Sequence, residues 1–227
     1  MPKVTPHATR DRLLAAAAAL FAERGFHATK ARDIAARAGV NLAAGNYHYG
    51  SKKALYLEVL RAQFTAVQAE LERHGARPAA NLSRLTRSEL EQLLRNRARV
   101  LLHLLVGPPP SLHATLMQRE MCDPSEALPV IVEEFILPML RETEAIIAHL
   151  APNLDAEQIE RCAFSVMGQA LFYRFTMPAT LRIWKMRHYP HRLADALSEH
   201  ITEFSLGGLA RVAGRRKRRA RRQSHAA

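Results

Sequence analysis

The chain has 227 residues and a formal net charge of +12 at pH 7, and this length is enough for one large domain or two modest ones. Because no segment has eighteen uninterrupted apolar residues and the first twelve residues contain no apolar run, we expect a soluble cytoplasmic protein without a membrane partner. The two cysteines, Cys122 and Cys162, lie far apart in apolar stretches, which favours reduced, buried thiols over a disulfide framework.

The positive charge is concentrated at the two ends of the chain. Residues 1–61 carry ten Lys or Arg against four Asp or Glu, whereas residues 62–210 carry fifteen against seventeen. Residues 211–227 carry eight basic residues and no acidic one. Two basic ends around a slightly acidic middle predict a polyanionic partner for the ends and a different task for the middle.

The N-terminal residues predict an arm followed by a first helix. Residues 1–8 contain two prolines, which favours a disordered arm. Thr9 is a suitable N-cap for a helix from Arg10 to about Arg24, and the apolar face of this segment predicts that it packs into a core. Gly25 then predicts the end of the helix.

The stretch from Thr29 to Lys53 predicts a helix-turn-helix. Thr29 is a suitable N-cap for a short helix that Gly39 ends, and Asn41 is a suitable cap for a second short helix. Apolar residues recur at helix-face spacing along the first helix, whereas polar and aromatic residues gather on and after the second. Two short helices around a tight glycine-containing turn are the arrangement in which a helix-turn-helix reads DNA.

The following sequence predicts helices only. Ser51 is a suitable cap for a long helix, residues 74–81 mark the best domain boundary, and Thr86 with Glu89 predicts a capping box. No alternating strand pattern and no repeat of fixed length occurs, so we predict an all-α protein. The expected helices are 52–73, 87–106, 112–121, 125–150, 156–177 and 191–206.

The end of the chain predicts a basic tail. Gly207 and Gly208 end the last expected helix, and residues 211–227 form a low-complexity basic segment that we expect to be disordered. Two interpretations remain open. The segment is either a solvated tail or a nonspecific attraction for phosphate that strengthens DNA association at low salt.

Two sequence blocks between Arg12 and Leu60 are more specific: LLAAAAALFAERGFHATKARDIAARAGV and, after it, NYHYGSKKALYLEVL. Together they resemble the N-terminal domain of the TetR/AcrR family of bacterial one-component transcriptional regulators. Asn41 stands where the family most often has Ser, which keeps a capping oxygen. The segment LMQREMCDPSEAL at 116–128 further resembles the CecR-like subgroup. The resemblance implies a helix-turn-helix domain at 9–52 and a helical domain at 53–210 that binds an effector and forms a dimer.

The predicted DNA contacts divide into phosphate contacts and base contacts. Hydroxyl, ammonium and backbone N–H groups at the ends of the stretch suit phosphate, whereas the apolar residues and the amide of the second helix suit thymine methyl groups and adenine. The predicted DNA-binding residues are Thr29, Lys30, Asn41, Leu42, Ala43, Ala44, Gly45, Asn46, Tyr47, His48 and Lys52.

The predicted effector contacts come from the middle of the chain. Met and aromatic residues at helical spacing normally pack a core, so His103 and Glu120, polar groups on otherwise apolar faces, are the more informative members of the set. The candidate ligand-binding residues are His103, Met117, Glu120, Met121, Phe135, Met139, Phe164, Met167, Phe172 and Trp184.

For the homodimer we expect the helices at 155–177 and 191–206 to form the interface. Small residues would allow close approach, and a two-fold dimer predicts an imperfect palindrome as the operator. The small residues are Ala163, Gly168 and Ala170, and the apolar ones are Phe164, Leu171, Leu193, Leu197, Ile201 and Phe204.

The sequence therefore predicts a ligand-responsive transcriptional regulator, most simply a repressor, that a small-molecule effector releases from double-stranded operator DNA. An architectural DNA-binding protein with weak sequence preference is the alternative. An enzyme is not expected, because the chain has no GxSxG, HExxH, Gly-rich phosphate loop or paired-cysteine motif, and no cofactor or metal site is predicted.

Overall fold

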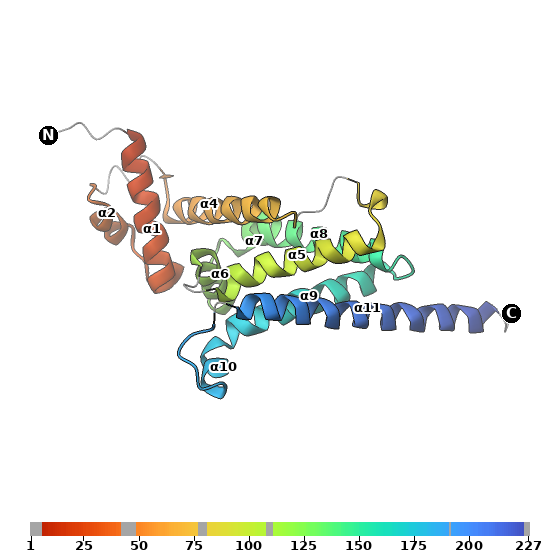
Figure 1. Cartoon of the computed structure of the whole chain (residues 1–227). Helices are drawn as coiled ribbons and strands as arrows, with labels where there is room; N and C mark the ends of the chain where they lie inside the picture. Colours follow the sequence, from red (N-terminus) through yellow and green to blue (C-terminus); the bar gives the residue numbers. More distant parts are fainter. Residues whose placement is uncertain (1–5, 42–48, 77–80, 108–110, 191, 225–227) are drawn as a thin grey trace. The chain divides into compact units, whose positions relative to one another are not determined.

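The computed structural model describes residues 6–41, 49–76, 81–107, 111–190 and 192–224. Every regular element within these ranges is a helix, and no strand occurs in them (Figure 1), so the predicted all-α fold is confirmed. Within the same ranges, no helix is long and apolar enough to cross a lipid bilayer.

The chain forms two compact units. The N-terminal unit comprises residues 1–67 and 111–135, and the C-terminal unit comprises residues 68–110 and 136–227. The division that we predicted at residue 53 lies inside a long helix and does not coincide with these units. Residues 111–135, which we assigned to the effector domain, pack with the N-terminal helices instead.

In the N-terminal unit, the first helix begins earlier than predicted and is interrupted at Gly25, where we predicted its end. Helix α1 spans Pro6–Ala28, so it begins before the predicted cap at Thr9. At Gly25 the backbone leaves the helical conformation with φ 80°, which glycine adopts without the steric cost of a Cβ. The predicted arm at 1–8 lies outside the described residues for its first five positions.

Helix α2 (Ala31–Ala38) begins one residue later than predicted. Its N-cap is Lys30, without a side-chain capping bond, so the prediction that Thr29 caps it is wrong. The buried Thr29 hydroxyl donates instead to the carbonyl oxygens of Leu20, at 3.2 Å, and Gly25, at 2.7 Å. Gly39 ends α2 in the left-handed conformation, as predicted.

Helix α4 (Lys52–Arg73) has the predicted bounds, and the Ser51 hydroxyl accepts from the N–H of Ala54 at 3.0 Å. Its aromatic residue Tyr56 packs into the core of the N-terminal unit, with its ring centroid 4.8 Å from that of Phe21 and 5.1 Å from that of Phe26. The unit is completed by α6 (Leu112–Cys122), α7 (Leu128–Ile131) and all but the last residue of a π-helical turn at Val132–Ile136.

The C-terminal unit consists of a short 3₁₀ turn at Leu82–Arg84 and a group of longer helices. The predicted capping box of Thr86 with Glu89 is present, and the structure shows a second box that joins Asp155 to Gln158. Figure 1 shows α11 lying alongside α5. The helices are α5 (Arg87–Val106), α8 (Leu137–Leu150), α9 (Ala156–Phe175), α10 (Met177–Ile183) and α11 (Leu193–Ser224).

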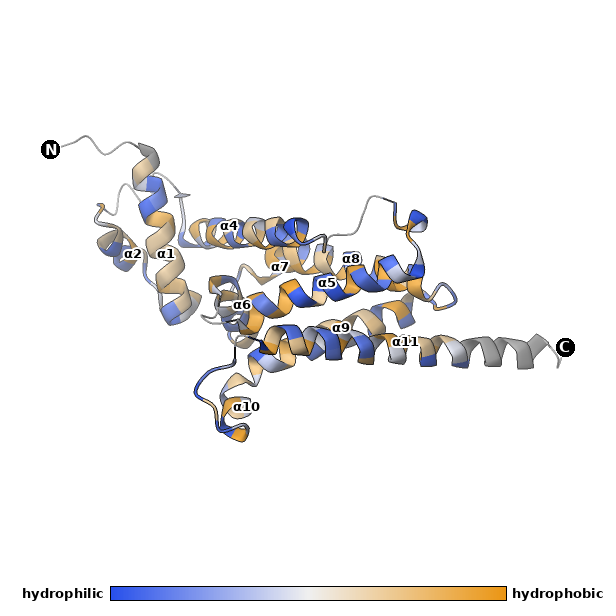
Figure 2. Ribbon diagram, viewed as in Figure 1, coloured by the Kyte–Doolittle hydropathy of each residue, from blue (hydrophilic) through white to orange (hydrophobic). Residues whose placement is uncertain are grey.

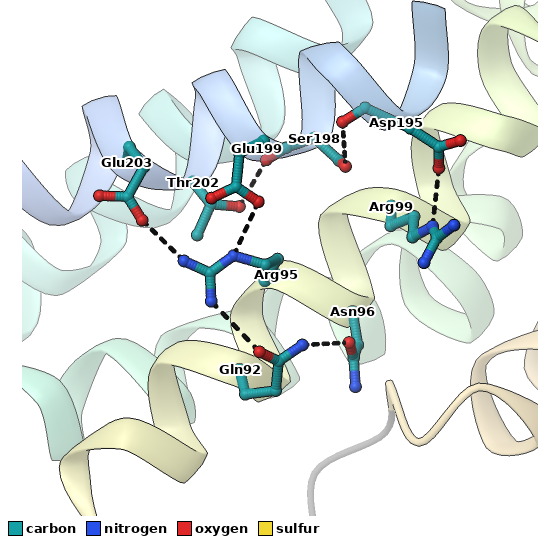
Figure 3. A network of polar contacts seen from close by, with 9 residues as sticks. All are labelled: Gln92, Arg95, Asn96, Arg99, Asp195, Ser198, Glu199, Thr202 and Glu203. Atoms are coloured by element: carbon teal, nitrogen blue, oxygen red, sulfur yellow. Dashed lines mark hydrogen bonds and ion pairs between the residues drawn. The ribbon is translucent and has the colours of Figure 1, made fainter. Parts of the chain in front are cut away.

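Charged residues join α5 to α11 along their solvent side (Figure 3). Arg95 donates to Glu199 at 3.1 Å and to Glu203 at 2.6 Å, and Arg99 donates to Asp195 at 2.7 Å. Exposed ion pairs of this kind contribute little stability individually. They do fix the register of α11 against α5.

The buried guanidinium of Arg97 is the polar centre of this unit. It donates to Glu142 at 2.8 Å, to the Thr143 hydroxyl at 3.1 Å and to the Met139 carbonyl at 2.9 Å. The Arg97 side chain is only 2% exposed, so these partners offset the loss of its hydration. No local pattern indicates this role, because Glu142 is 45 residues away in the sequence.

Two predicted helix ends are wrong in this unit. Pro178, expected to follow the end of a helix at 177, lies in the first turn of α10, where its missing N–H costs no hydrogen bond. Helix α11 continues through Gly207 and Gly208 to Ser224, so most of the segment 211–227 is helical in place of the predicted disordered tail. The glycines do not end the helix, because Leu209, directly after them, is buried in the core of this unit and holds the next turn in place.

Candidate nucleic-acid interface

The segment that we predicted to enter the major groove lies outside the described residues. It comprises Leu42, Ala43, Ala44, Gly45 and Asn46, and the predicted phosphate contacts Tyr47 and His48 lie outside the described residues as well. The structure describes the residues on both sides of this segment.

Of the predicted contacts that the structure describes, Lys30 and Asn41 are exposed at the two ends of α2 and its turn. Thr29 is different, because its side chain is completely buried and its hydroxyl is bonded to backbone carbonyls. The hydroxyl of Thr29 therefore closes the end of α1, and our prediction that it contacts phosphate is wrong.

Lys52 has a structural role that the sequence did not show. Its Nζ donates to the carbonyl oxygens of Phe26, at 2.9 Å, and Thr29, at 3.2 Å, and it lies 4.1 Å from the centre of the Phe26 ring. The first turn of α4 thus holds the loop between α1 and α2. An ammonium group has three donors, so one remains for a phosphate oxygen.

Tyr49, the first described residue after residues 42–48, contacts Arg10, and we selected neither residue from the sequence. The Tyr49 hydroxyl donates to the Arg10 carbonyl at 3.2 Å, and the Arg10 guanidinium lies 5.9 Å from the centre of the Tyr49 ring. Burial raises the pKa of the Tyr49 hydroxyl, so it remains a donor at neutral pH. The second tyrosine of the YHY sequence was the available signal.

A buried carboxylate connects α6 to α4 within the N-terminal unit. Glu120 is 1% exposed and accepts from the Tyr56 hydroxyl at 2.9 Å, from the Ser125 N–H at 2.9 Å and from the Ser125 hydroxyl at 3.0 Å. Burial, followed by the nearby carboxylate, raises the pKa of Tyr56 above its ordinary value. Glu120, expected to need partners or a ligand, has partners from the protein itself.

Further contacts fasten α6 and the segment after it to α1 and α4. Arg119 donates to the carbonyl oxygens of Ala22 and Glu23 at the end of α1. Arg61 of α4 donates to both carboxylate oxygens of Glu134, at 2.8 and 2.9 Å. A displacement of α6 would therefore act directly on the helices that carry the helix-turn-helix.

His113 also lies on α6 in the N-terminal unit, and its buried ring disfavours protonation. Its ring packs edge-on against Phe64 at 4.7 Å, and its Nδ1 has no hydrogen-bond partner among the described residues. Burial lowers its pKa from the ordinary value of 6.5 to about 4. The folded state thus disfavours the protonated ring.

We expect this histidine to weaken folding in mild acid. Between pH 6.5 and about 4 the unfolded chain takes up a proton at His113 that the folded chain does not, so stability present above pH 6.5 is lost as the pH falls. At pH 5 the loss is about 2 kcal/mol. Urea unfolding at pH 7.5 and pH 5 measures it, and His113→Gln should remove about that difference. An equal acid loss in the variant would contradict the assignment.

The candidate effector residues do not behave as one group. Met117, Glu120, Met121 and Phe135 belong to the N-terminal unit, and the other six belong to the C-terminal unit. Phe135 and Met139 are buried, and Met117 and Met167 are partly buried. His103 is exposed and pairs with Asp195 at 2.9 Å. With His103, five members are exposed, and an inward placement is wrong for them; the other four are Met121, Phe164, Phe172 and Trp184.

Two parts of the chain match families of known proteins. A family described as bacterial regulatory proteins, tetR family, matches residues 13–59. A second family, described as the C-terminal domain of the HTH-type transcriptional dual regulator CecR, matches residues 89–209, which is more than half of the chain. The chain belongs to the TetR family of bacterial transcriptional regulators, with a C-terminal domain of the CecR type.

Two relatives match different lengths of this chain. The HTH-type transcriptional dual regulator CecR of Shigella flexneri is 32% identical over 146 residues, which is 61% of this chain and 63% of CecR. The HTH-type transcriptional repressor KstR2 of Mycolicibacterium smegmatis is 46% identical over 56 residues, which is 25% of this chain and 27% of KstR2. The matched part thus spans less than two thirds of either relative.

A solved structure supports the fold over nearly the whole length. The crystal structure of a TetR-like transcriptional regulator from Rhodococcus sp. RHA1 superposes with a TM-score of 0.64 and covers 92% of this chain and 98% of its own. Its sequence is 19% identical, so the likeness concerns the fold alone. Together with the family matches, it confirms the predicted helix-turn-helix regulator architecture.

The TetR-family chain leaves an apolar surface on α9, α10 and α11 uncovered. We call it the α9–α11 face, and Figure 2 shows the hydrophobic colouring of α10 and parts of α9. Several residues that we predicted for the interface, Ala163, Ala170, Leu197 and Ile201, are buried in the chain's own core instead. The exposed large members of the face are Phe164, Leu171, Phe172, Phe175, Ile183, Trp184 and Phe204.

The C-terminal unit of the TetR-family chain also contains an open groove of about 500 Å³. Helix α5 and the last turns of α4 line it, and Arg99 and His103 place cationic or polar groups beside its apolar wall. The lining residues are Glu70, His74, Asn96, Arg99, Val100, His103 and Leu104.

Both cysteines of the TetR-family chain are free thiols. Cys122 is exposed, so the prediction that it is buried is wrong, whereas Cys162 is partly buried and burial raises its pKa. In the part of the chain that the structure describes, no group of three His, Cys, Asp or Glu side chains lies close enough together to hold a metal ion.

Proposed function

We propose that this chain is a cytoplasmic, ligand-responsive repressor that binds a palindromic operator as a homodimer and leaves it when a small-molecule effector binds. The observation that carries the proposal is that one chain joins a TetR-type DNA-binding segment at 13–59 to a CecR-type domain at 89–209. The buried contact between Glu120 and Tyr56 supports a switch, since it ties α6 to the helix that follows the helix-turn-helix. A catalytic role has no support from the family, whose members are transcriptional regulators.

In this proposal DNA is bound through three kinds of group. Lys30, Lys52 and the N–H groups at the start of α2 bind phosphate. Leu42, Ala43 and Ala44 contact thymine methyl groups, and Asn46 pairs with adenine. Tyr47 and His48 bind phosphate together with Lys52, and Asn41 and Gly45 complete the surface.

The homodimer forms through the α9–α11 face. The seven large apolar side chains exposed on this face are more than a monomer normally leaves in contact with water. A two-fold axis through this face would place two helix-turn-helix segments on one side of the DNA, at half-sites about one helical turn apart or a multiple of it.

For the effector we propose the groove beside His103 and Arg99. It lies in the C-terminal unit, in or next to the part that matches the CecR-type domain, and its volume of about 500 Å³ suits a small molecule. Replacing His103 with Ala should reduce the response to the effector without reducing operator affinity.

The test of this function begins with the DNA that adjoins the protein's own gene. Protection of a single imperfect palindrome against nuclease, together with its loss on addition of an effector found by screening, is the expected result. Uniform binding along all DNA would favour the architectural alternative instead. A reporter under the operator then separates repression from activation, because deletion of the regulator raises expression in the first case and lowers it in the second.

Replacing Lys52 with Ala should weaken binding to all DNA sequences alike. The variant loses a phosphate contact, and the carbonyls of Phe26 and Thr29 lose their donor, so the loop before α2 loosens. We expect about tenfold weaker binding and a salt dependence flatter by about one unit. Titrations of operator and random duplex at two salt concentrations measure both. The matched control is Lys53→Ala, and an equal loss there would contradict the special position of Lys52.

A further inference from the structure

The C-terminal part of α11 is not explained by operator binding through the helix-turn-helix. Helix α11 packs against the core of the C-terminal unit as far as Val212 and Ala213, and Asn153 donates to the Ala213 carbonyl at 2.9 Å. The helix then continues to Ser224, over about 16 Å. Figure 1 shows this end of α11 extending past the ends of α5, α8 and α9. It therefore does not serve to fill that core.

The charge of this end is of one sign only. Eight of the twelve residues from 211 to 222 are Lys or Arg, and no Asp or Glu occurs after residue 203. Arg211 and Arg215 are exposed. Basic residues also stand four positions apart in the sequence, at 211 and 215, 215 and 219, 217 and 221, and 218 and 222. Like charges at this spacing destabilise a helix, so a bound polyanion would stabilise this one.

The other residues of the segment narrow the class of polyanion. GRRKRRARRQS, residues 214–224, contains no apolar residue larger than Ala and no aromatic residue. A helix that lies in a membrane surface needs a face of Leu, Phe or Trp, and proteins that bind single-stranded nucleic acid stack its bases on aromatic rings. Insertion into a membrane and stacking of bases therefore do not fit this composition, whereas binding through charge alone does. The phosphate backbone of a duplex needs only positive charge.

The spacing of the charges also suits a duplex. Eight cations over twelve helical residues give about one charge per 2 Å, and duplex DNA carries about one phosphate per 1.7 Å of its axis. We propose that residues 211–224 form a second DNA-binding element, separate from the helix-turn-helix, which binds the phosphate backbone of duplex DNA without sequence preference. The element goes beyond operator recognition, since it would hold the regulator on any DNA and assist its search for the operator.

Neutralising the basic segment tests this assignment. The first variant replaces Arg216, Lys217, Arg218 and Arg219 with Gln in the full-length protein. The control removes the same charge from exposed positions elsewhere in the C-terminal unit: Arg161, Arg182, Arg187 and Arg192, each to Gln. Fluorescence anisotropy follows binding to a random-sequence duplex between about 50 and about 200 mM salt.

We expect the first variant to bind the random duplex at least tenfold more weakly at low salt, with a salt dependence flatter by about 2 to 4 units, whereas the control changes by less than one unit. Equal losses in the two variants would show an effect of net charge and overturn the proposal. So would an unchanged salt dependence combined with loss of binding to phosphatidylglycerol vesicles, which would indicate a membrane. A random duplex contains no operator, so this measurement does not depend on operator recognition. A protein that fails to recognise its operator would contradict the proposed function and leave this proposal intact.

Discussion

Replacing Phe172 with Glu should convert the regulator into monomers and lower its operator affinity by about 100-fold or more. Phe172 is 58% exposed in the single chain and lies on the same face of α9 as Phe164 and Phe175. If this face meets its copy across a two-fold axis, the dimer buries two copies of each side chain, one from each protomer. In the variant the two introduced carboxylates would then be buried without water to solvate them, and near the axis they would repel each other.

The loss of affinity follows from the loss of the second half-site. A dimer binds its second half-site as an intramolecular event, and this advantage amounts to about 10² to 10⁴ in affinity. A monomer retains only the contacts of one helix-turn-helix. Light scattering gives the oligomeric state, and titration of the operator gives the affinity.

Met121→Glu is the matched control for this experiment. Met121 is another exposed apolar residue, at 40%, but it belongs to α6 of the N-terminal unit and not to the α9–α11 face. We expect it to leave the dimer intact. A dimeric Phe172→Glu protein with normal operator affinity would rule out α9 as the interface.

The elements that the sequence predicted correctly are those fixed by local chemistry. Ser51, Ser111, Thr86 and Asp155 each accept a hydrogen bond from a backbone N–H three residues later, so their helices begin where the sequence indicates. The glycine after α2 ends it for an equally local reason, because its φ of 63° suits glycine.

The errors arise where distant contacts decide. Thr29 has the right chemistry for a cap, yet its hydroxyl bonds to carbonyls of α1, which no local pattern reveals. Gly207 and Gly208 would end an isolated helix, but the packing of Leu209 and Val212 against other helices continues α11 through them.

The candidate effector site shows a further limit of periodicity. On α9, Ala163 faces the core and its neighbour Phe164 faces solvent, although size alone favours the opposite. A helix with two apolar faces does not reveal which one packs inside the chain and which one meets another copy. The exposed position of His103 could not be predicted either, because its partner Asp195 lies 92 residues away in the sequence.

Removing the carboxylate of Glu120 should both destabilise the protein and disturb DNA binding. In Glu120→Ala the Tyr56 hydroxyl and the N–H and hydroxyl of Ser125 lose their acceptor in a buried site. An unsatisfied buried donor costs about 1 to 3 kcal/mol, so we expect the free energy of unfolding to fall by about 3 kcal/mol. Urea unfolding at pH 7.5 measures it, with the exposed Glu133→Ala as control.

Tyr56→Phe separates signalling from stability at the same contact. The variant keeps the ring that packs on Phe21 and Phe26 and loses only the hydroxyl. Its free energy of unfolding should therefore fall by about 1 kcal/mol. The direct link from α6 to α4 is then broken while Glu120 keeps its bonds to Ser125. If the link transmits the effector signal, a saturating effector should lower operator affinity by a smaller factor in this variant than in the parent protein. An unchanged factor would mean that the Arg119 and Arg61 contacts carry the coupling and that the Tyr56 contact serves stability only.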